Sequence, residues 1–310
     1  MTAQTDIKIV LVTQKTRLEE LIRRYNTVGQ AKFLIEHQGG DFSDYQTEHD
    51  VYRAVVAKAV AFLQGCGRLQ ILNRDQVPNY LFGEKDLVIA IGRDGLVANV
   101  LKYLNQQSLI GINPDPKRWD GCLLPFSVDD IPKIVPETVE KRRPIQSITL
   151  AQATLNDGQT LFGVNDLFIG RQTHASARYE LFQGRQKEIQ SSSGIIVSTG
   201  LGSTGWFKSI LAGAGGINRY CGGNRIILPE KFDRSSTVLY YTVREPYAST
   251  STGASMVFGK VDRNSPLKIV SCMPENGVIF SDGMEQDFLQ FNSGSVATIG
   301  IAPHQGQLVV

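Results

Sequence analysis

Short apolar runs alternate with amphipathic stretches along the first part of the chain. The runs at residues 7–12, 69–72, 87–91 and 109–112 predict buried strands. Apolar residues recur three or four positions apart at residues 16–25, after residue 50 and at residues 98–104, which predicts helices. Strands that alternate with helices predict a parallel sheet, and such sheets bind ligands at the carboxyl ends of their strands.

Two details of this first part concern where its helices begin. Residues 26–46 contain the turn signal Gly-Gly-Asp at 39–41, so we expect this segment to be loop-like in places. Thr47 followed by Asp50 resembles a capping box, with aspartate in place of the usual glutamate or glutamine. We therefore expect the helix with its apolar stripe after residue 50 to begin at this pair.

The pattern becomes β-like after residues 132–144, which contain three prolines and a basic cluster. Short strands are predicted at residues 147–154, 160–164, 167–169, 236–243, 277–280, 295–301 and 307–310. We expect an α/β N-terminal domain over residues 1–135 and a β-rich, sandwich-like domain over residues 136–290. A C-terminal segment, residues 291–310, is expected to return to the N-terminal domain.

The composition narrows the classes of partner. The chain of 310 residues has 32 basic and 30 acidic side chains, and its net charge of +2 is too balanced for a nucleic-acid or membrane-surface protein. Its four cysteines lie far apart and its four histidines lack metal-ligand spacing, so we expect no disulfide framework and no protein-held metal. No apolar run reaches the ~18 residues that span a membrane, and we expect a cytoplasmic protein.

The first chemical candidate is the turn Gly92-Arg93-Asp94-Gly95, directly after the apolar run at residues 87–91. Glycine lets a ligand approach the backbone closely, and a carboxylate can take a proton or orient a hydroxyl. The turn therefore has the composition of a ligand loop. The alternative is a plain strand-to-helix turn in which Asp94 caps the helix.

The second candidate is the glycine-rich stretch at residues 193–216. A strand at 195–197 is expected to enter a loop of small residues and then a short helix, which would offer backbone N–H groups to an anion. Gly200, Gly202 and Gly205 spell G-x-G-x-x-G, the fingerprint of dinucleotide-binding Rossmann folds. That fold is disfavoured, because mostly β-like residues follow and position 225 is arginine where an acid is needed. A glycine-rich turn without a ligand stays open as an alternative.

Taken in order, these motifs resemble those of the NAD kinase family, especially its mitochondrial-type branch and bacterial relatives. Residues 92–96 (GRDGL) match G-G-D-G-T, Asn165-Asp166 matches an N-E pair, and residues 199–206 (TGLGSTGW) match a T-P-T-G-S-T-A-Y-like loop. Further matches are GINPDP at 111–116, FIGRQTHASARYE at 168–180, SSSG at 191–194 and REP at 244–246. The resemblance runs from about residue 85 to 285.

This resemblance implies the family's fold and reaction. The fold is an α/β domain followed by a β-sandwich-like, dinucleotide-binding domain. The reaction moves the γ-phosphoryl of ATP, or a phosphoryl of polyphosphate, to the 2′-hydroxyl of the adenosine ribose of NAD, giving NADP. Magnesium accompanies the donor, and the enzymes are homodimers or larger homo-oligomers that act on small molecules.

The resemblance also implies roles for individual residues. Asp94 would be the catalytic base, within the Gly92, Arg93 and Gly95 turn that receives the phosphates. The residues that would bind the dinucleotide are Asn165, Asp166, Thr204, Gly205, Trp206, Ser209 and Asp282.

Three departures from the family pattern keep other functions open. Arg93 replaces a glycine and Leu96 a threonine, so the chain is either a kinase with a modified phosphate loop or a catalytically impaired nucleotide-binding or regulatory protein. Arg93 would then either bind a phosphate bidentately or block it. Asp166 replaces glutamate, which leaves open a kinase for another hydroxyl acceptor, such as a lipid or sugar.

Overall fold

The apolar run at the start of the chain forms an inner strand of a parallel sheet. In the computed structural model, which describes residues 7–227 and 232–310, the strand order is β2-β1-β3-β4, all parallel. The strands are β1 (Lys8–Thr13), β2 (Arg68–Asn73), β3 (Leu87–Ile91) and β4 (Ser108–Ile112). Every residue of β3 is buried, which explains its unbroken apolar sequence. The predicted strands of this sheet are confirmed.

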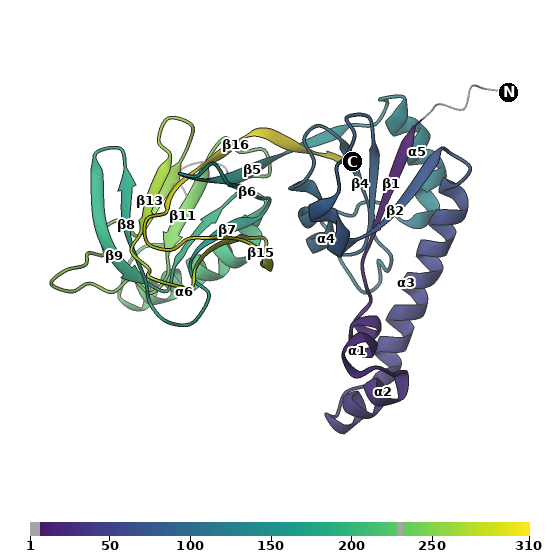
Figure 1. Cartoon of the computed structure of the whole chain (residues 1–310), viewed down its shortest axis with the longest axis horizontal. Coiled ribbons are helices and arrows are strands. Elements are labelled where there is room, and N and C mark those ends of the chain that lie inside the picture. The colour runs from purple at the N-terminus through teal and green to yellow at the C-terminus, as the bar shows by residue number, and fades with distance from the viewer. Residues whose placement is uncertain (1–6, 228–231) are drawn as a thin grey trace. The chain divides into compact units, whose positions relative to one another are not determined.

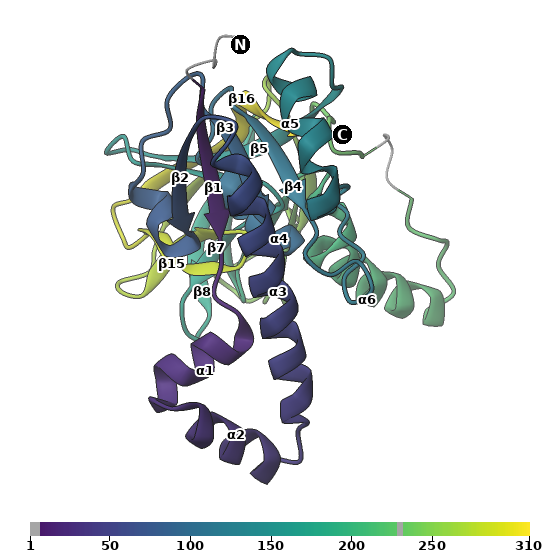
Figure 2. The same cartoon turned by 90° about the vertical axis from the view of Figure 1, so that its right-hand side faces the viewer.

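Helices pack on this sheet and extend beyond it. They are α1 (Arg17–Tyr25), α2 (Val28–His37), α3 (Phe42–Leu63), α4 (Asp94–Leu101) and α5 (Ile131–Val139). Ala59 and Leu63 of α3 share a buried core with Ile131 and Ile134 of α5 and with the apolar side chains of β1 and β3. The other end of α3 projects past the sheet, where α1 and α2 pack against it (Figure 2).

The starts of three helices differ from the prediction. Residues 28–37 form α2, whose N-cap Thr27 accepts a hydrogen bond from the Gln30 N–H at 3.1 Å. The capping box at Thr47 is wrong: α3 begins at Phe42, and Asp41 caps it. The Thr47 hydroxyl instead donates to the Ser43 carbonyl inside the helix, at 2.8 Å. Helix α4 spans Asp94–Leu101, so it begins earlier than the predicted residues 98–104.

The chain divides into two units after α5. Met1–Gln146 with Gln307–Val310 form the first unit, and Ser147–Gly306 form the second (Figure 1). The proline-rich segment before the division is largely helical. Pro132 lies in the first turn of α5, where no N–H partner is needed, and Pro136 lies inside the helix. Arg143 is held by an ion pair to Glu137 at 2.7 Å.

The second unit contains two packed antiparallel sheets. One consists of β9-β8-β13-β16 with β5 and β6 beside β16, and the other has the order β12-β11-β10-β7-β14-β15. The strands are β5 (Ile145–Leu155), β6 (Thr160–Gly163), β7 (Asp166–Arg171), β8 (Ala177–Gln183), β9 (Gln186–Ser192), β10 (Ile195–Ser198), β11 (Leu239–Val243), β12 (Phe258–Val261), β13 (Leu267–Ser271), β14 (Gly277–Ser281), β15 (Met284–Gln290) and β16 (Val296–Val309). The expected α/β region and β-rich sandwich are both confirmed.

The sandwich core and one helix complete this unit. Tyr179 and Ile269 of the first sheet share a buried cluster with Ile195 and Tyr241 of the second. Helix α6 (Trp206–Tyr220) packs on the other face of the second sheet, where Phe207 contacts Tyr240.

The C-terminal strand serves both units. Val296–Ile299 of β16 pair with β13, whereas Gln307 and Leu308 pair in parallel with β4. The two strands predicted at the C-terminus are therefore one continuous strand. Among the described residues, none of the helices has the length and apolar composition needed to cross a membrane.

Candidate functional site

Asp94 is the first residue of α4 and follows shortly after the end of β3. Its carboxylate accepts hydrogen bonds from the backbone N–H of Leu123, at 2.7 Å, and of Cys122, at 3.2 Å. These bonds hold the loop after β4 against the start of α4 and leave further lone pairs on the carboxylate. The alternative in which Asp94 caps the helix is wrong, because the N-cap residue is Arg93.

The two glycines of this turn have different roles. A Cβ at Gly92 would lie 2.8 Å from a methyl group of Leu96 and 3.1 Å from the Gln14 side chain, so a larger residue here would require these side chains to shift. A Cβ at Gly95 would meet nothing within 4 Å. Space for a ligand therefore lies beside Gly95 rather than beside Gly92.

Arg93 is directed toward α3 and the loop after β4. Its guanidinium donates to Glu48 at 2.9 Å and lies over the ring of Trp119, 4.0 Å from the ring centroid. Within the part of the chain that the structure describes, the ion-pair partner of Arg93 is thus Glu48 and not the adjacent Asp94. The carboxylate charge of Asp94 is therefore not paired with the guanidinium of the adjacent Arg93.

In the second unit, the Asn165-Asp166 pair is held by Asp282. The Asp282 carboxylate accepts hydrogen bonds from the backbone N–H of Asn165 at 2.6 Å and of Val164 at 3.0 Å. Asp282 has the left-handed backbone conformation, with φ at 54°, which turns its side chain back onto this segment. Asp282 therefore fixes the backbone of the Asn165-Asp166 pair.

Asp166 titrates far from its usual range. Its side chain is buried at 7% exposure, and this burial, together with the charge of Asp282, raises its pKa to about 7. A good share of Asp166 is therefore protonated near neutral pH and has an O–H to donate.

The glycine-rich loop docks on the same segment. The Thr199 hydroxyl donates to the Val164 carbonyl at 2.6 Å, and the Gly202 N–H donates to that hydroxyl at 3.2 Å. A Cβ at Gly202 would lie 2.0 Å from the Asn165 carbonyl oxygen, and one at Gly200 would lie 1.6 Å from the Asp233 carbonyl oxygen. These two glycines permit close contact between backbones, which is the physical reason for their presence.

The Rossmann interpretation of this loop is excluded by the sheet around it. β10, which leads into the loop, pairs antiparallel with β7 and with β11, whereas a dinucleotide-binding βαβ unit needs parallel strands. After the loop, a 3₁₀ turn over Gly202–Thr204 leads into α6. Thr204, Gly205 and Ser209 are exposed at this end of α6.

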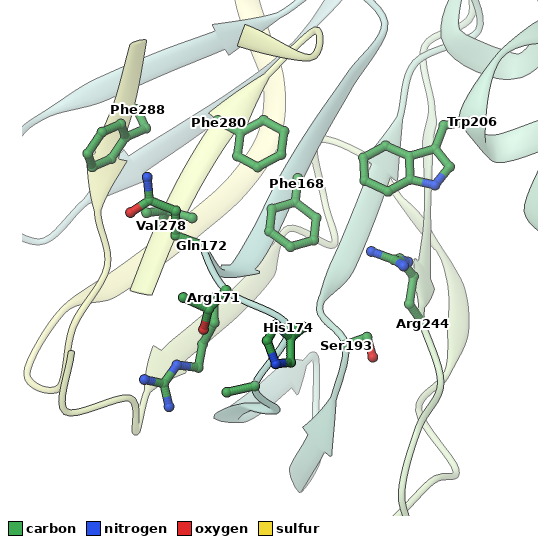
Figure 3. A pocket seen from close by; sticks show the side chains of 12 residues that line it. Phe168, Arg171, Gln172, His174, Ser193, Trp206, Arg244, Val278, Phe280 and Phe288 are labelled. Atoms are coloured by element: carbon green, nitrogen blue, oxygen red, sulfur yellow. The ribbon is translucent and has the colours of Figure 1, made fainter. Parts of the chain in front are cut away.

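An aromatic pocket lies on the α6-covered face of the second sheet. Phe168 lies between Phe280 and Trp206 (Figure 3) and stacks on both, with ring centroids 4.7 and 5.9 Å apart, respectively. The guanidinium of Arg244 lies 5.2 Å from the centroid of the Trp206 ring. The pocket encloses about 300 Å³, and His174 and Ser193 are among the residues that line it.

The pocket contains residues that sequence reasoning did not assign to the site. Register places Phe280 directly opposite Phe168 and Phe288 opposite Phe280, so three strands align their rings. A Cβ at Gly170 would lie 2.6 Å from the Phe168 ring, so this glycine makes room for it. The alternation of Phe168 and Gly170 in β7 is a sequence signal for a ring packed over a glycine. No sequence signal shows that Phe280 and Phe288 lie opposite on the neighbouring strands.

The predicted site residues therefore gather in two places. Gly92, Arg93, Asp94 and Gly95 form one turn in the first unit. The second unit brings the predicted dinucleotide-binding residues together on β7, the glycine-rich loop, the start of α6 and the turn after β14; these are Asn165, Asp166, Thr204, Gly205, Trp206, Ser209 and Asp282.

Comparisons with known proteins find similarity to NAD kinases. No protein-family model matches the chain. NAD kinase 2 of Geobacillus kaustophilus (strain HTA426) is 26% identical over 133 residues, which cover 42% of this chain and 49% of that protein. The chain thus spans about half the length of the curated relative that it matches.

Two solved structures share the fold. An NAD kinase from Archaeoglobus fulgidus in complex with ATP matches with a TM-score of 0.56 and 15% identity, over 98% of this chain and 94% of that chain. Yeast NADH kinase complexed with NADH matches with a TM-score of 0.57 and 14% identity, over 99% of this chain and 84% of that chain. The chain therefore has the NAD kinase fold, and its similarity to a curated NAD kinase supports the resemblance to that family.

Proposed function

We propose that this chain is a kinase that phosphorylates NAD at the 2′-hydroxyl of its adenosine ribose, with ATP or polyphosphate as the donor. The pocket of Phe168, Trp206 and Arg244 carries this proposal. Stacked rings favour a flat heteroaromatic group, and an arginine beside them favours a phosphate on the same molecule. A dinucleotide offers both.

The second unit would bind the acceptor. Asp166 starts the strand that also carries Phe168, and the two side chains share one face of β7 because strand residues alternate. A protonated Asp166 would donate a hydrogen bond to a ribose hydroxyl, and Asn165 would supply an amide beside it. The shorter reach of aspartate compared with glutamate is one reason to test other acceptors.

The first unit would act on the phosphoryl group. Asp94 would accept the proton of the 2′-hydroxyl as its oxygen attacks the γ-phosphorus and the bond to the bridging oxygen breaks, which releases ADP. In phosphoryl transfer the protein mainly positions the reacting groups and neutralises charge. A carboxylate fixed by two backbone N–H groups, such as Asp94, is well positioned for this task.

Magnesium fits the proposal as a companion of the donor. The described residues contain no group of three or more His, Cys, Asp or Glu side chains that could hold a metal ion. Mg²⁺ in kinases is held largely by phosphate oxygens, water and one or two carboxylates, so it needs no protein cage. When bound, it would neutralise charge on the phosphate chain.

The two hydrogen bonds on Asp94 also favour a second candidate, a regulatory protein that binds the dinucleotide without turnover. In that case Asp94 has only the structural role of holding the loop after β4. A third candidate, a kinase for a lipid or sugar hydroxyl, depends on Asp166 alone.

The test is formation of NADP from NAD, ATP and magnesium, read by a coupled dehydrogenase. We expect the wild-type chain to turn over and Asp94→Asn to lose about 10²–10⁴-fold in kcat, with NAD binding retained. Asp120→Asn, an exposed acid in the loop that Asp94 holds, is the matched control and should keep full activity. Wild-type protein that binds NAD but makes no NADP would favour the regulatory candidate, and a panel of lipid and sugar acceptors tests the third.

A further inference from the structure

Three arginines and two acids from distant parts of the chain meet beside the Asp94 turn. Arg93 pairs with Glu48 at 2.9 Å, and Arg118 pairs with Asp44 at 2.6 Å. Arg17 bridges the two acids: it lies 2.7 Å from Asp44 and also pairs with Glu48. Both acids come from α3, a helix whose outer end carries α1 and α2. The charged cluster therefore joins α1 and α3 to the turn before α4.

Arg93 has spare binding capacity in this cluster. A guanidinium has five N–H donors, and Glu48 takes one of them, on Nη2. Trp119 covers one face of the guanidinium, and the side chain is 38% exposed. Arg93 is thus held in a defined orientation by one hydrogen bond and one ring, with donors left for a second anion.

Glu48 is the partner that can release Arg93 at low cost. Its side chain is only 11% exposed, so an unpaired Glu48 carboxylate would be unfavourable. Arg17 already pairs with it, and Arg118 approaches within 4.0 Å. Loss of the Arg93 contact therefore leaves Glu48 paired.

We propose that Arg93 binds the phosphate chain of the donor and that Glu48 is the carboxylate it leaves to do so. This rests on the proposed function only in identifying the anion as a kinase donor. Arg93 stands at the carboxyl end of β3, where parallel sheets bind ligands, and beside Asp94. A phosphate chain offers bidentate contacts and several negative charges, whereas Glu48 offers one oxygen.

The proposal predicts a ligand class. A chain of phosphates binds through Arg93, whereas a single phosphate competes poorly with Glu48. ATP and inorganic tripolyphosphate should therefore bind in the same way, and orthophosphate should bind weakly. Arg93, at a position where the resembled family has glycine, would then supply positive charge in place of the exposed glycine backbone.

The experiment uses Trp119 as the reporter. The chain has two tryptophans, so Trp206→Phe leaves Trp119 as the only one, with Arg93 on its ring. Titration of this full-length variant with sodium tripolyphosphate, without NAD, should change its emission saturably. Calorimetric titration of chains that keep both tryptophans measures the affinity independently of the reporter.

Four variants separate the contributions. Arg93→Met should weaken tripolyphosphate binding at least about tenfold, and Arg93→Lys should fall between it and wild type because lysine keeps the charge but not the fork. Glu48→Gln should tighten binding about fivefold, as expected when a competing ion pair is removed. Asp44→Asn is the matched control, since Asp44 pairs with Arg17 and Arg118 but not with Arg93, and should leave the affinity within about twofold.

Two results would overturn the proposal: Arg93→Met that binds tripolyphosphate as wild type does, or Asp44→Asn that tightens binding as much as Glu48→Gln. These outcomes are distinct from failure of the proposed function. Arg93-dependent tripolyphosphate binding without NADP formation would support the anion site and contradict the kinase function. NADP formation by Arg93→Met with an unchanged KM for ATP would support the kinase function and contradict the anion site.

Discussion

At the scale of single residues, Asp166 shows how position sets chemistry. An ordinary aspartate is ionised at neutral pH, but burial at the start of β7 and the charge of Asp282 keep the Asp166 proton up to about pH 7. The unfolded chain loses this proton near the usual pKa of 3.8. The folded form therefore binds more protons between these values, and its stability falls as the pH rises through this window.

Replacement of Asp166 by asparagine should remove this pH dependence. We expect the advantage of Asp166→Asn over wild type in free energy of unfolding to be larger at pH 8 than at pH 5, by about 2–3 kcal/mol. Urea unfolding in a Trp119→Phe background, where Trp206 reports on the second unit, measures it. An advantage that is equal at the two pH values would contradict the assigned protonation.

At the scale of elements, α3 is the helix that positions the ends of two strands. The Tyr52 hydroxyl accepts a hydrogen bond from the Gln14 N–H at 2.8 Å and donates one to the Ile91 carbonyl at 2.9 Å. Burial raises the pKa of Tyr52 to about 12, so it stays a hydroxyl. Glu48 lies one turn away on the same helix face and holds Arg93. One helix thus contacts the end of β1, the end of β3 and the turn at residues 92–95.

Tyr52→Phe should therefore destabilise the first unit. It leaves the Gln14 N–H and the Ile91 carbonyl without their partner, at a cost of about 1–3 kcal/mol. Trp119 fluorescence during urea unfolding, in the Trp206→Phe background, measures the change. Tyr45→Phe on the same helix is the control, because the Tyr45 ring contacts Arg17 through its face, which phenylalanine retains. Equal loss in both variants would argue against the hydroxyl bridge.

At the scale of the whole molecule, the described residues form a main core in each unit, and one strand contributes to both units. Leu308 of β16 is fully buried in the first unit, where it pairs with Leu109 of β4. Ile299, earlier in the same strand, is fully buried in the core of the second unit. The strand links the units covalently, but each core is built from its own side chains.

Truncation of either side chain should affect one core at a time. We expect Leu308→Ala to lower the free energy of unfolding reported by Trp119 by about 2–5 kcal/mol and to leave the Trp206 transition in place. Ile299→Ala should give the reverse pattern. Single-tryptophan backgrounds separate the two signals during urea unfolding. Transitions that move together in both variants would show that the two cores unfold as one.

Much of this architecture follows from local pattern. The apolar runs of β1 and β3 and the period of α1 predict their elements, because each depends on neighbours in the sequence. Helix α2 and the start of α3 were missed, since their caps at Thr27 and Asp41 are short polar signals inside a turn-like segment. The sequence pattern predicts two strands where β16 is one, because the middle of β16 contains a proline that interrupts the strand pattern.

The sequence by itself determined the strands of the parallel sheet, the change from an α/β part to a β-rich part, and the candidate motifs. Only the tertiary structure decided that Arg93 pairs with Glu48 rather than Asp94, that the pKa of Asp166 is raised, and that the Phe168 ring stacks on those of Phe280 and Trp206. The reason is physical: periodicity is a property of neighbouring residues, whereas ion pairing, desolvation and stacking depend on distances between residues that are far apart in the chain.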